Sequence, residues 1–516
     1  MKKARVTVWA LLVAALCGCG GDDSSEGAAG SSSGGTGAGG SAGAGGPSTG
    51  GTSGAAGSEG GSAGASAGGS GGSGGSSGAT GGSGAGGPGG SSGAGGFVPE
   101  PGPRSIVYPA DWQPGYETTR PSDDARLFIQ DFSYAGYGNS EVPLPTGDFA
   151  DVIQVDVDTS GATDVTAAIQ AAIDQAEANP GGAIVKLPAG LFRLDGPLTV
   201  EGSNVVLRGA GSDQTKLWFA DGGGVGEQIA LLVTSESWVD ETSDPGWAMT
   251  REGAIFEDFV EVEDPSGISA GDDIAIAWDI TAEFKAEHNS SDYWYHVSEG
   301  ERRTFFRRTV RDVAGNRISF HVPLRYPVKL RDNPVVLRAD GFATGNGVEH
   351  LAVSTALGSP SASWNSGVDQ ARAIQMRFCK DCWIRDVASF AADGEEHHLR
   401  SHGIYVERSF RVTVADSHLE KSEHLGGGGN GYLFQLSRTN EVLVRDCIGR
   451  EGRHNFSINW DFGSSGNVFL RGESTGGLVC GSLQAQLDGD CSEGPSDFHH
   501  ALAVANLFDN VEVNDA

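Results

Sequence analysis

The chain is poor in the residues that mark several protein classes. Only 7 of its 516 residues are cysteine, too few for a disulfide-framework protein. Its 35 Lys and Arg stand against 67 Asp and Glu, a formal net charge of −32 that would repel a phosphate backbone, so we expect no nucleic-acid partner. After the first apolar run no stretch is long enough to cross a bilayer, which excludes a multi-pass membrane protein.

The first apolar run is typical of an export signal. Three basic residues precede a short apolar stretch over residues 6–16, and the stretch ends in Gly18-Cys19. This ending resembles the bacterial lipobox, so we expect residues 1–18 to be a lipoprotein signal peptide and Cys19 to be lipidated; an ordinary signal peptide cut nearby is the alternative. No Asp follows the cysteine. We therefore expect an exported lipoprotein of the outer membrane or cell surface, held in the lipid membrane by its N-terminal anchor.

Composition divides the rest of the chain. Residues 19–96 hold the lipidated Cys and a Gly/Ser/Ala segment that has no apolar surface to bury, so we expect a disordered linker. Residues 97–162 are rich in proline and aromatics and are expected to pack irregularly on a larger body. That body is expected over residues 163–516. Apolar residues at helical spacing predict a helix over 164–177, followed by short strand-like runs.

A repeat of two dozen to thirty residues dominates the C-terminal part. Four strand-like segments begin at Ala373, Gly403, Gly431 and Asn455, and a fifth begins at Ala501. Each of the first four is followed by a second strand-like run. Such a repeat predicts a stacked solenoid, and the lack of a leucine-rich consensus favours a parallel β-helix. Residues about 255–340 interrupt the rhythm and look like a small β insertion that could border a substrate groove.

The opening of the body resembles the pectate-lyase superfamily of β-helix proteins. The resemblance is carried by the helix over 164–173, by Leu187-Pro188-Ala189-Gly190 with its following strand, and by the Arg208-Gly209-Ala210-Gly211 turn. It implies an all-β fold, a single-stranded right-handed parallel β-helix with an N-terminal cap helix. Because this superfamily includes lyases, hydrolases, epimerases and binding proteins, the resemblance implies carbohydrate chemistry without fixing the reaction.

The repeat alignment places imidazole and guanidinium groups in one column. Equal positions on successive coils lie about 4.8 Å apart. The column is expected to hold His402, Asn430 and His454, with His500 in the fifth unit, and to be flanked by Arg372, Arg400 and Arg453. A cationic trough of this kind on an acidic protein suits an acidic, uronate-containing polysaccharide.

For β-elimination on a uronate, cations bind the carboxylate, a base removes the C5 proton and an acid assists the leaving oxygen. We assign the base to His402 or His454, the acid to Tyr405, and the carboxylate clamp to Arg400 or Arg453. Arg372, Asn430, Trp460 and His500 are candidate substrate-binding residues. The alternative for each is a turn residue that bonds to neighbouring coils, and for Trp460 a place in the core.

Three further patterns add alternatives. Asp386, Asp416 and Asp446 recur every 30 residues, which suggests a weak Ca²⁺ site or, more simply, turn residues that accept backbone N–H bonds. Ser401-His402-Gly403 is similar to the Gly-His-Gly segment of polygalacturonase-type glycosidases, but the preceding coil lacks their carboxylate pair. Hydrolysis, with acids among Glu395, Glu396, Glu407 and Asp461, and a non-catalytic glycan-binding surface protein therefore remain the alternatives. Cys480 and Cys491 flank a short loop and are expected to form a disulfide.

Overall fold

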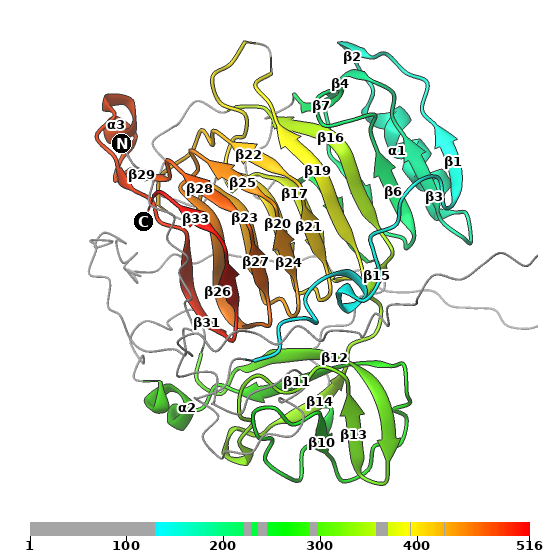
Figure 1. The fold of residues 1–516 in the computed structure, drawn as a ribbon, viewed down its shortest axis with the longest axis vertical. Coiled ribbons are helices and arrows are strands. Elements are labelled where there is room, and N and C mark those ends of the chain that lie inside the picture. The colour runs from blue at the N-terminus through cyan, green and yellow to red at the C-terminus, as the bar shows by residue number, and fades with distance from the viewer. Residues whose placement is uncertain are drawn as a thin grey trace, which may run out of the picture. The chain divides into compact units, whose positions relative to one another are not determined.

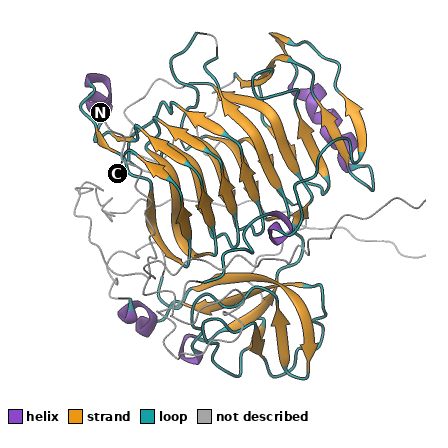
Figure 2. Cartoon of the chain, in the orientation of Figure 1, coloured by secondary structure: helices purple, strands orange, loops and turns teal. Residues whose placement is uncertain are grey.

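The computed structural model describes residues 130–515, except 221–228, 236–244, 289–297, 358–369, 393 and 428. The signal peptide, Cys19, the linker and residues 97–129 of the predicted N-terminal segment lie outside the described residues, as do the side chains of Trp460 and His500. Strands are the main regular structure of the described chain and helices are few (Figure 2). Among the described residues, no helix combines the length and the apolar character needed to span a bilayer.

Parallel strands stack in successive coils (Figure 1). The longest row runs in the order β1, β3, β6, β16, β19, β21, β24, β27 and β32 (Asp151–Gln154, Ala183–Lys186, Val205–Arg208, Gly347–Thr355, Trp383–Ser389, Thr413–Ala415, Leu443–Arg445, Val468–Leu470, Leu507–Asp509). Two shorter rows join the same sheet, namely β2, β4 and β7 (Ser160–Asp164, Gly190–Leu194, Thr215–Phe219) and β22, β25, β28 and β33 (His418–Glu420, Ile448–Arg450, Glu473–Thr475, Glu512–Val513).

A second parallel sheet forms the other main face of the coils. Its order is β5, β8, β17, β20, β23, β26 and β31 (Leu198–Val200, Ile229–Val233, Arg372–Arg377, His402–Glu407, Tyr432–Ser437, His454–Ser465, Asp497–Val504). Val, Ile, Leu and Phe side chains from both sheets meet in one buried core, with the free thiols of Cys379, Cys382 and Cys447 inside it. This is a parallel β-helix, as the repeat predicts.

The N-terminal part of the described chain packs on the first coils and along one face. Helix α1 (Thr166–Glu177) buries Ile169, Ile173 and Ala176 in the main core, in the region where the sequence predicts a helix. Before it, the short 3-10 helix η3 (Tyr137–Ser140) and its neighbours lie against Trp383 on the outer side of β19. The described residues of this segment also include β1 and the start of β2, which belong to the main sheet.

An antiparallel sheet interrupts the coils. It runs in the order β10, β13, β12, β11, β14 and β9 (Phe259–Glu261, Arg317–Phe320, Arg302–Ala314, Asp273–Asp279, Val335–Arg338, Trp247–Ala248), with α2 (Ala282–Glu287) and the 3-10 helix η4 (Leu330–Asp332). Its aromatic core includes Trp278 stacked on Phe305 at a ring-centroid distance of 3.5 Å. The insertion therefore starts earlier than residue 255, because β9 pairs with β14.

Two small ladders complete the fold. β15 (Ala343–Thr344) pairs in parallel with β18 (Cys379–Lys380), and β29 (Leu478–Val479) pairs antiparallel with β30 (Ser492–Glu493). Between β29 and β30 lies helix α3 (Leu483–Asp488), and here Cys480 and Cys491 are joined in a disulfide, the pairing expected from the sequence.

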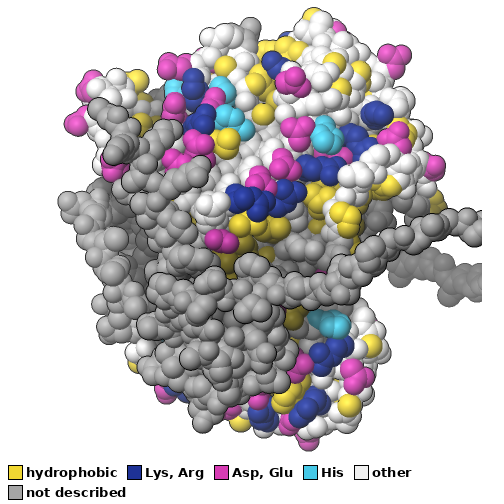
Figure 3. All heavy atoms as spheres, in the orientation of Figure 1, with side chains coloured by type: hydrophobic (Ala, Val, Ile, Leu, Met, Phe, Trp, Pro, Cys, Tyr) yellow, Lys and Arg dark blue, Asp and Glu magenta, His cyan; other side chains and the backbone are white. Residues whose placement is uncertain are grey.

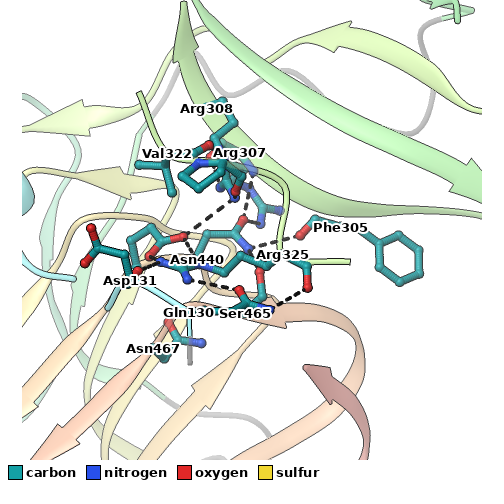
Figure 4. A network of polar contacts seen from close by, with 12 residues as sticks. Gln130, Asp131, Phe305, Arg307, Arg308, Val322, Arg325, Asn440, Ser465 and Asn467 are labelled. Carbon is teal, nitrogen blue, oxygen red and sulfur yellow. Dashed lines mark hydrogen bonds and ion pairs between the residues drawn. The ribbon is translucent and has the colours of Figure 1, made fainter. Parts of the chain in front are cut away.

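A buried polar network ties the insertion to the coils (Figure 4). Arg325 donates two hydrogen bonds to Glu441, of 2.9 Å and 2.8 Å, and also binds the backbone oxygen of Asp131. Asn440, next in the chain, accepts the backbone N–H of Arg307 and donates to the carbonyl oxygen of Phe305, both in β12. The side chains of Arg325 and Glu441 are 0% and 1% exposed. The network fixes β12 beside the turn that follows β23.

The register corrects two positions of the predicted repeat. Tyr432 pairs with His454 and Ile404 with Phe434, so the third unit begins two residues later than Gly431. Gly429 and Gly431 have φ of 80° and 75°, so the glycine run continues as a turn up to the strand. In the fifth unit Asn459 pairs with His499 and Asp461 with Ala501, because β31 pairs along the middle and end of the long strand β26. His500 is therefore not level with His454.

Candidate active site

Four side chains from four successive strands form one ladder at the start of the second sheet. The register joins Arg372 of β17 to His402 of β20, and Tyr432 of β23 to His454 of β26. The Tyr432 ring stacks on both imidazoles, with centroid distances of 5.2 Å to His402 and 5.0 Å to His454. The ladder expected from the sequence exists, with Tyr432 where Asn430 was predicted.

The ladder residues lie on the outer side of the sheet, and Arg372 and Arg453 contact the tyrosines there. The residues that follow them, Ala373 and Leu433 for example, point into the core. The Arg372 guanidinium lies 4.8 Å from the ring centroid of Tyr405, a residue whose side chain also faces outward. Arg453 donates a hydrogen bond of 3.2 Å to the Tyr432 hydroxyl. Cationic groups thus border the imidazoles and the phenol, as an anion-binding site requires.

Loop backbone closes over the ladder, which differs from the open trough expected. His402 is 2% exposed and His454 is 3% exposed. The Nδ1 atom of His454 lies 2.6 Å from the carbonyl oxygen of Pro495, in the loop before β31. The backbone N–H of Gly431 donates to the Ser401 hydroxyl at 3.1 Å, which holds the glycine-rich turn beside His402. The repeat spacing predicts the column but carries no information about these connecting loops.

Burial sets the protonation of the ladder. It lowers the pKa of His402 well below its ordinary value of 6.5, and the positive charge of Arg372 adds to the effect. Burial also lowers the pKa of His454 to about 4. The same cause raises the pKa of Tyr405 to about 12, and it raises that of Tyr432 as well. At neutral pH the site therefore offers neutral imidazoles and protonated phenols beside charged arginines.

A carboxylate that sequence reasoning missed joins the end of the ladder. Asp497 of β31 lies 3.7 Å from Nδ1 of His454 and 2.9 Å from Nδ1 of His499. The hydroxyl of Ser457 donates to the other oxygen of Asp497 at 3.1 Å. Interaction with His499 helps to lower the pKa of Asp497 although burial opposes this, so the group is a carboxylate. The sequence signal was the spacing of Asp497 and His499, which are two residues apart on one strand and therefore share a side.

Three predicted site residues lie elsewhere. Asn430 is wholly buried and braces the glycine-rich turn: its amide donates to the Gly427 carbonyl oxygen at 2.8 Å, and its oxygen accepts from Ser401 at 3.2 Å. Arg400 precedes the ladder, and its backbone N–H bonds to the Thr355 hydroxyl. His500 belongs to β31 at a level beyond Asn459, where the ladder has ended.

The aspartate column exists, and its side chains contact basic residues of the chain itself. Asp386, Asp416 and Asp446 have φ of 50°, 52° and 54°, a left-handed bend that Asp tolerates. Asp446 is bound by Arg471 at 2.6 Å and by Arg445 at 2.7 Å, and Asp386 is bound by His350 at 2.8 Å. The two arginines place positive charge at Asp446, as a bound cation would. On the face shown in Figure 3, basic and acidic side chains lie next to each other over the coil strands.

Two of the four acids considered for hydrolysis are already engaged. Asp461 lies between Arg303 at 2.8 Å and Arg438 at 3.0 Å, so both of its carboxylate oxygens take part in ion pairs. Glu407 accepts a hydrogen bond from Gln375 at 3.0 Å. Neither pairs with a second carboxylate across an open site in the contacts of the described residues.

Comparison with protein families supports the resemblance at the start of the body. Residues 149–251 match a family model described as rhamnogalacturonase A/epimerase, pectate lyase-like. Two mannuronan C5-epimerases of Azotobacter vinelandii, AlgE3 and AlgE5, are 43% and 41% identical to this chain over 101 residues. The matched stretch covers 18% of this chain but spans only 5% of AlgE3 and 10% of AlgE5.

Solved structures align with part of the chain at low sequence identity. The tailspike gp61 of Pseudomonas phage phi297 is 13% identical, with 64% of this chain and 65% of that chain covered and a TM-score of 0.35. The catalytic domain of a GH87 alpha-1,3-glucanase in complex with tetrasaccharides is 9% identical, with 64% and 41% covered and a TM-score of 0.28.

Proposed function

We propose that this protein acts on an acidic polysaccharide by removing the C5 proton of a uronate residue, and that β-elimination follows. The observation that carries the proposal is the ladder: a neutral imidazole, His402, is stacked on a phenol, Tyr432, between the guanidinium groups of Arg372 and Arg453. A base, an acid and two carboxylate-binding cations are the groups that this reaction needs.

Each group has a role in the proposed step. Arg372 and Arg453 bind the uronate carboxylate and thereby acidify the proton at C5. His402 takes that proton, the electron pair forms the C4–C5 double bond, and the bond from C4 to the glycosidic oxygen breaks. Tyr405 or Tyr432 donates the proton that the leaving oxygen needs. The products are an unsaturated uronyl end and a new reducing end.

His402 is the better base of the two imidazoles. The His454 ring is held by the Pro495 carbonyl oxygen and faces Asp497, whereas His402 lies directly between Arg372 and Tyr432. Access to His402 requires displacement of neighbouring loop backbone, of which the turn at Gly429 and Gly431 is the natural candidate because these residues carry no side chains. Substrate binding would then exclude water from the site.

Epimerisation is the second candidate, because it begins with the same step as β-elimination, the removal of the C5 proton. The similarity of one stretch to mannuronan C5-epimerases favours it. In that reaction a proton returns to C5 from the opposite face and no bond to oxygen breaks. Two phenols on neighbouring strands, Tyr405 and the ladder residue Tyr432, could return it.

A glycan panel with product analysis tests the proposal. Purified protein is incubated in D₂O with polygalacturonate, mannuronan and glycosaminoglycans, and products are followed by absorbance of unsaturated uronyl ends, by reducing ends and by NMR. New absorbance is the expected result, and deuterium at C5 without absorbance would identify an epimerase. Reducing ends alone would identify a hydrolase, and binding without any product a glycan-binding protein; both outcomes contradict the proposal.

We also propose that the protein is an exported lipoprotein that works at the outer membrane or cell surface. The support is the N-terminal signal and Gly18-Cys19. Metabolic labelling with a palmitate analogue tests this, since labelling should be lost in Cys19→Ser. An unlabelled wild-type protein would contradict it.

The pH profile of kcat/KM should fall on its acid side only at a low pH. Because burial and Arg372 lower the pKa of His402, its imidazole stays unprotonated below pH 6.5, so kcat/KM should fall only at a more acid pH. The charged or titratable groups that face it are Arg372, Tyr432, His424 and Arg453. Initial rates between pH 4 and pH 9, a range of about five units around the ordinary pKa of His, check this. An acid limb at or above 6.5 would remove His402 from the role of base.

The lowered pKa of His402 also determines how the stability of the protein changes with pH. An unfolded His402 takes up a proton near its ordinary pKa, whereas the folded one resists protonation, so the free energy of unfolding should decrease as the pH falls through this window. Urea denaturation at several pH values measures the slope. The variant His402→Gln should show a smaller slope.

A further inference from the structure

Two histidines and an aspartate converge where β26 and β31 lie side by side. Asp497 and His499 are two residues apart on β31 and therefore share a side, while His454 reaches them from the neighbouring strand. The three residues offer ligand atoms that all lie within 4.8 Å of one another. The two imidazole rings are 5.0 Å apart between centroids.

We propose that His454, Asp497 and His499 form a binding site for a divalent transition-metal ion, with Zn²⁺ as the preferred ion. Two imidazole nitrogens and one carboxylate oxygen are a ligand set that Zn²⁺ accepts, whereas Ca²⁺ prefers oxygen ligands alone. Bound Zn²⁺ holds such ligands at about 2.0–2.2 Å, so the three ligand atoms would draw together to roughly 3.3 Å from one another.

The surroundings of His454 prepare it as a ligand. Its Nδ1 donates to the Pro495 carbonyl oxygen at 2.6 Å, which fixes the ring and leaves Nε2 as the atom with a free electron pair. Within the described part of the chain, this buried Nε2 has no hydrogen-bond partner. A buried nitrogen without a partner costs free energy that a bound ion would recover.

The supporting contact of Asp497 points the same way. Ser457 binds one carboxylate oxygen, which orients the group while the other oxygen faces His499. Contacts of this kind around a metal site hold its ligands in place. Another imidazole–carboxylate group, His398 and His418 around Glu420, has contacts of 3.8 Å and 3.1 Å but is not drawn together in the same way.

The metal proposal does not depend on the proposed lyase reaction, although the metal site lies at the end of the same ladder. Three protein ligands leave a coordination position for water or for a substrate oxygen. The Tyr432 ring is 5.0 Å from that of His454, so an ion here would add positive charge beside the uronate site. The metal test below uses no glycan and would succeed or fail whichever reaction the protein performs.

Zinc titration of the full chain without a histidine tag tests the inference. The protein is stripped with a chelator, and ZnCl₂ binding is followed by isothermal titration calorimetry, with Co²⁺ absorption as a spectroscopic probe of the coordination. We expect one Zn²⁺ per chain at this site. Asp497→Asn and His499→Gln should each weaken binding about 10- to 100-fold, and CaCl₂ should not compete.

His418→Gln is the matched control, because it removes a histidine that contacts Glu420 on another sheet. Its zinc affinity should equal that of the wild type. Circular dichroism verifies that the Asp497 and His499 variants are folded, and His454→Gln provides a third ligand change. Absence of zinc binding in the wild type would overturn the inference, as would equal affinity in the folded ligand variants.

Discussion

Replacement of His402 by alanine should lower kcat/KM on the preferred uronate polymer by about 10²- to 10⁴-fold, the range typical for loss of a general base. The reason is geometric: His402 is the ladder residue between Arg372 and Tyr432. Initial rates of formation of unsaturated uronyl ends measure the effect. KM should change less than kcat, because the arginines that bind the carboxylate remain.

A second variant separates chemistry from packing. His402 is buried, so alanine leaves a cavity, whereas His402→Gln keeps most of the volume and cannot act as a base near neutral pH. Both variants should be equally inactive, and glutamine should preserve more of the melting temperature. The control is His418→Ala on the exposed side of β22, which should retain full activity. Activity of His402→Gln within about threefold of the wild type would eliminate His402 as the base.

The sequence predicts part of the ladder, although the coils differ in length. His402 follows Arg372 by 30 residues, Tyr432 follows His402 by 30, and His454 follows Tyr432 by 22. The alignment around Asn455 was correct, so Arg372, His402 and His454 do share one column. The third rung was placed two residues early. A run of glycines has no side-chain pattern that marks where the turn ends and the strand begins, so Asn430 was chosen instead of Tyr432.

Contacts made by irregular segments could not be predicted from the sequence. Asp497 joins His454 only because the loop around Cys480 and Cys491 returns the chain to the middle of β26, and no repeat predicts its length. The same holds for the closure over the ladder by Pro495. The sequence indicated the adjacent pair His499-His500, but neighbouring residues on a strand face opposite ways, and the useful partner of His499 is two residues before it.

The insertion shows the same limit on a larger scale. Its presence could be predicted because it breaks the rhythm of the coils, although β9 places its start before the predicted residue 255. Its attachment could not, because Arg325 and Glu441 are 116 residues apart in the sequence and neither belongs to a recognisable motif. Buried charge pairs of this kind are set by the final packing, which is why a substitution at Glu441 is expected to affect stability strongly.

Replacement of Glu441 by glutamine should destabilise the protein by about 3–5 kcal/mol, the cost typical of removing one partner of a buried ion pair. Glutamine preserves the volume but leaves the guanidinium group of Arg325 without its carboxylate. Arg308, 3.7 Å from Glu441 and 1% exposed, also loses its compensating charge. Burial already lowers the pKa of Arg308 to about 10 although Glu441 opposes this, so the site is intolerant of a further loss of negative charge. Urea denaturation followed by tryptophan fluorescence and circular dichroism measures the change.

The control is Glu473→Gln, which removes a carboxylate bound to Arg450 at 2.8 Å where both side chains are more than a third exposed. Solvent screens this pair, so its loss should cost about 0–1 kcal/mol. Because Glu441 joins the insertion to the coils through Arg325, we expect fluorescence of Trp278 in the insertion to change at lower urea in Glu441→Gln than circular dichroism of the coils. Equal urea midpoints for Glu441→Gln and Glu473→Gln would mean that the network does not hold the insertion in place.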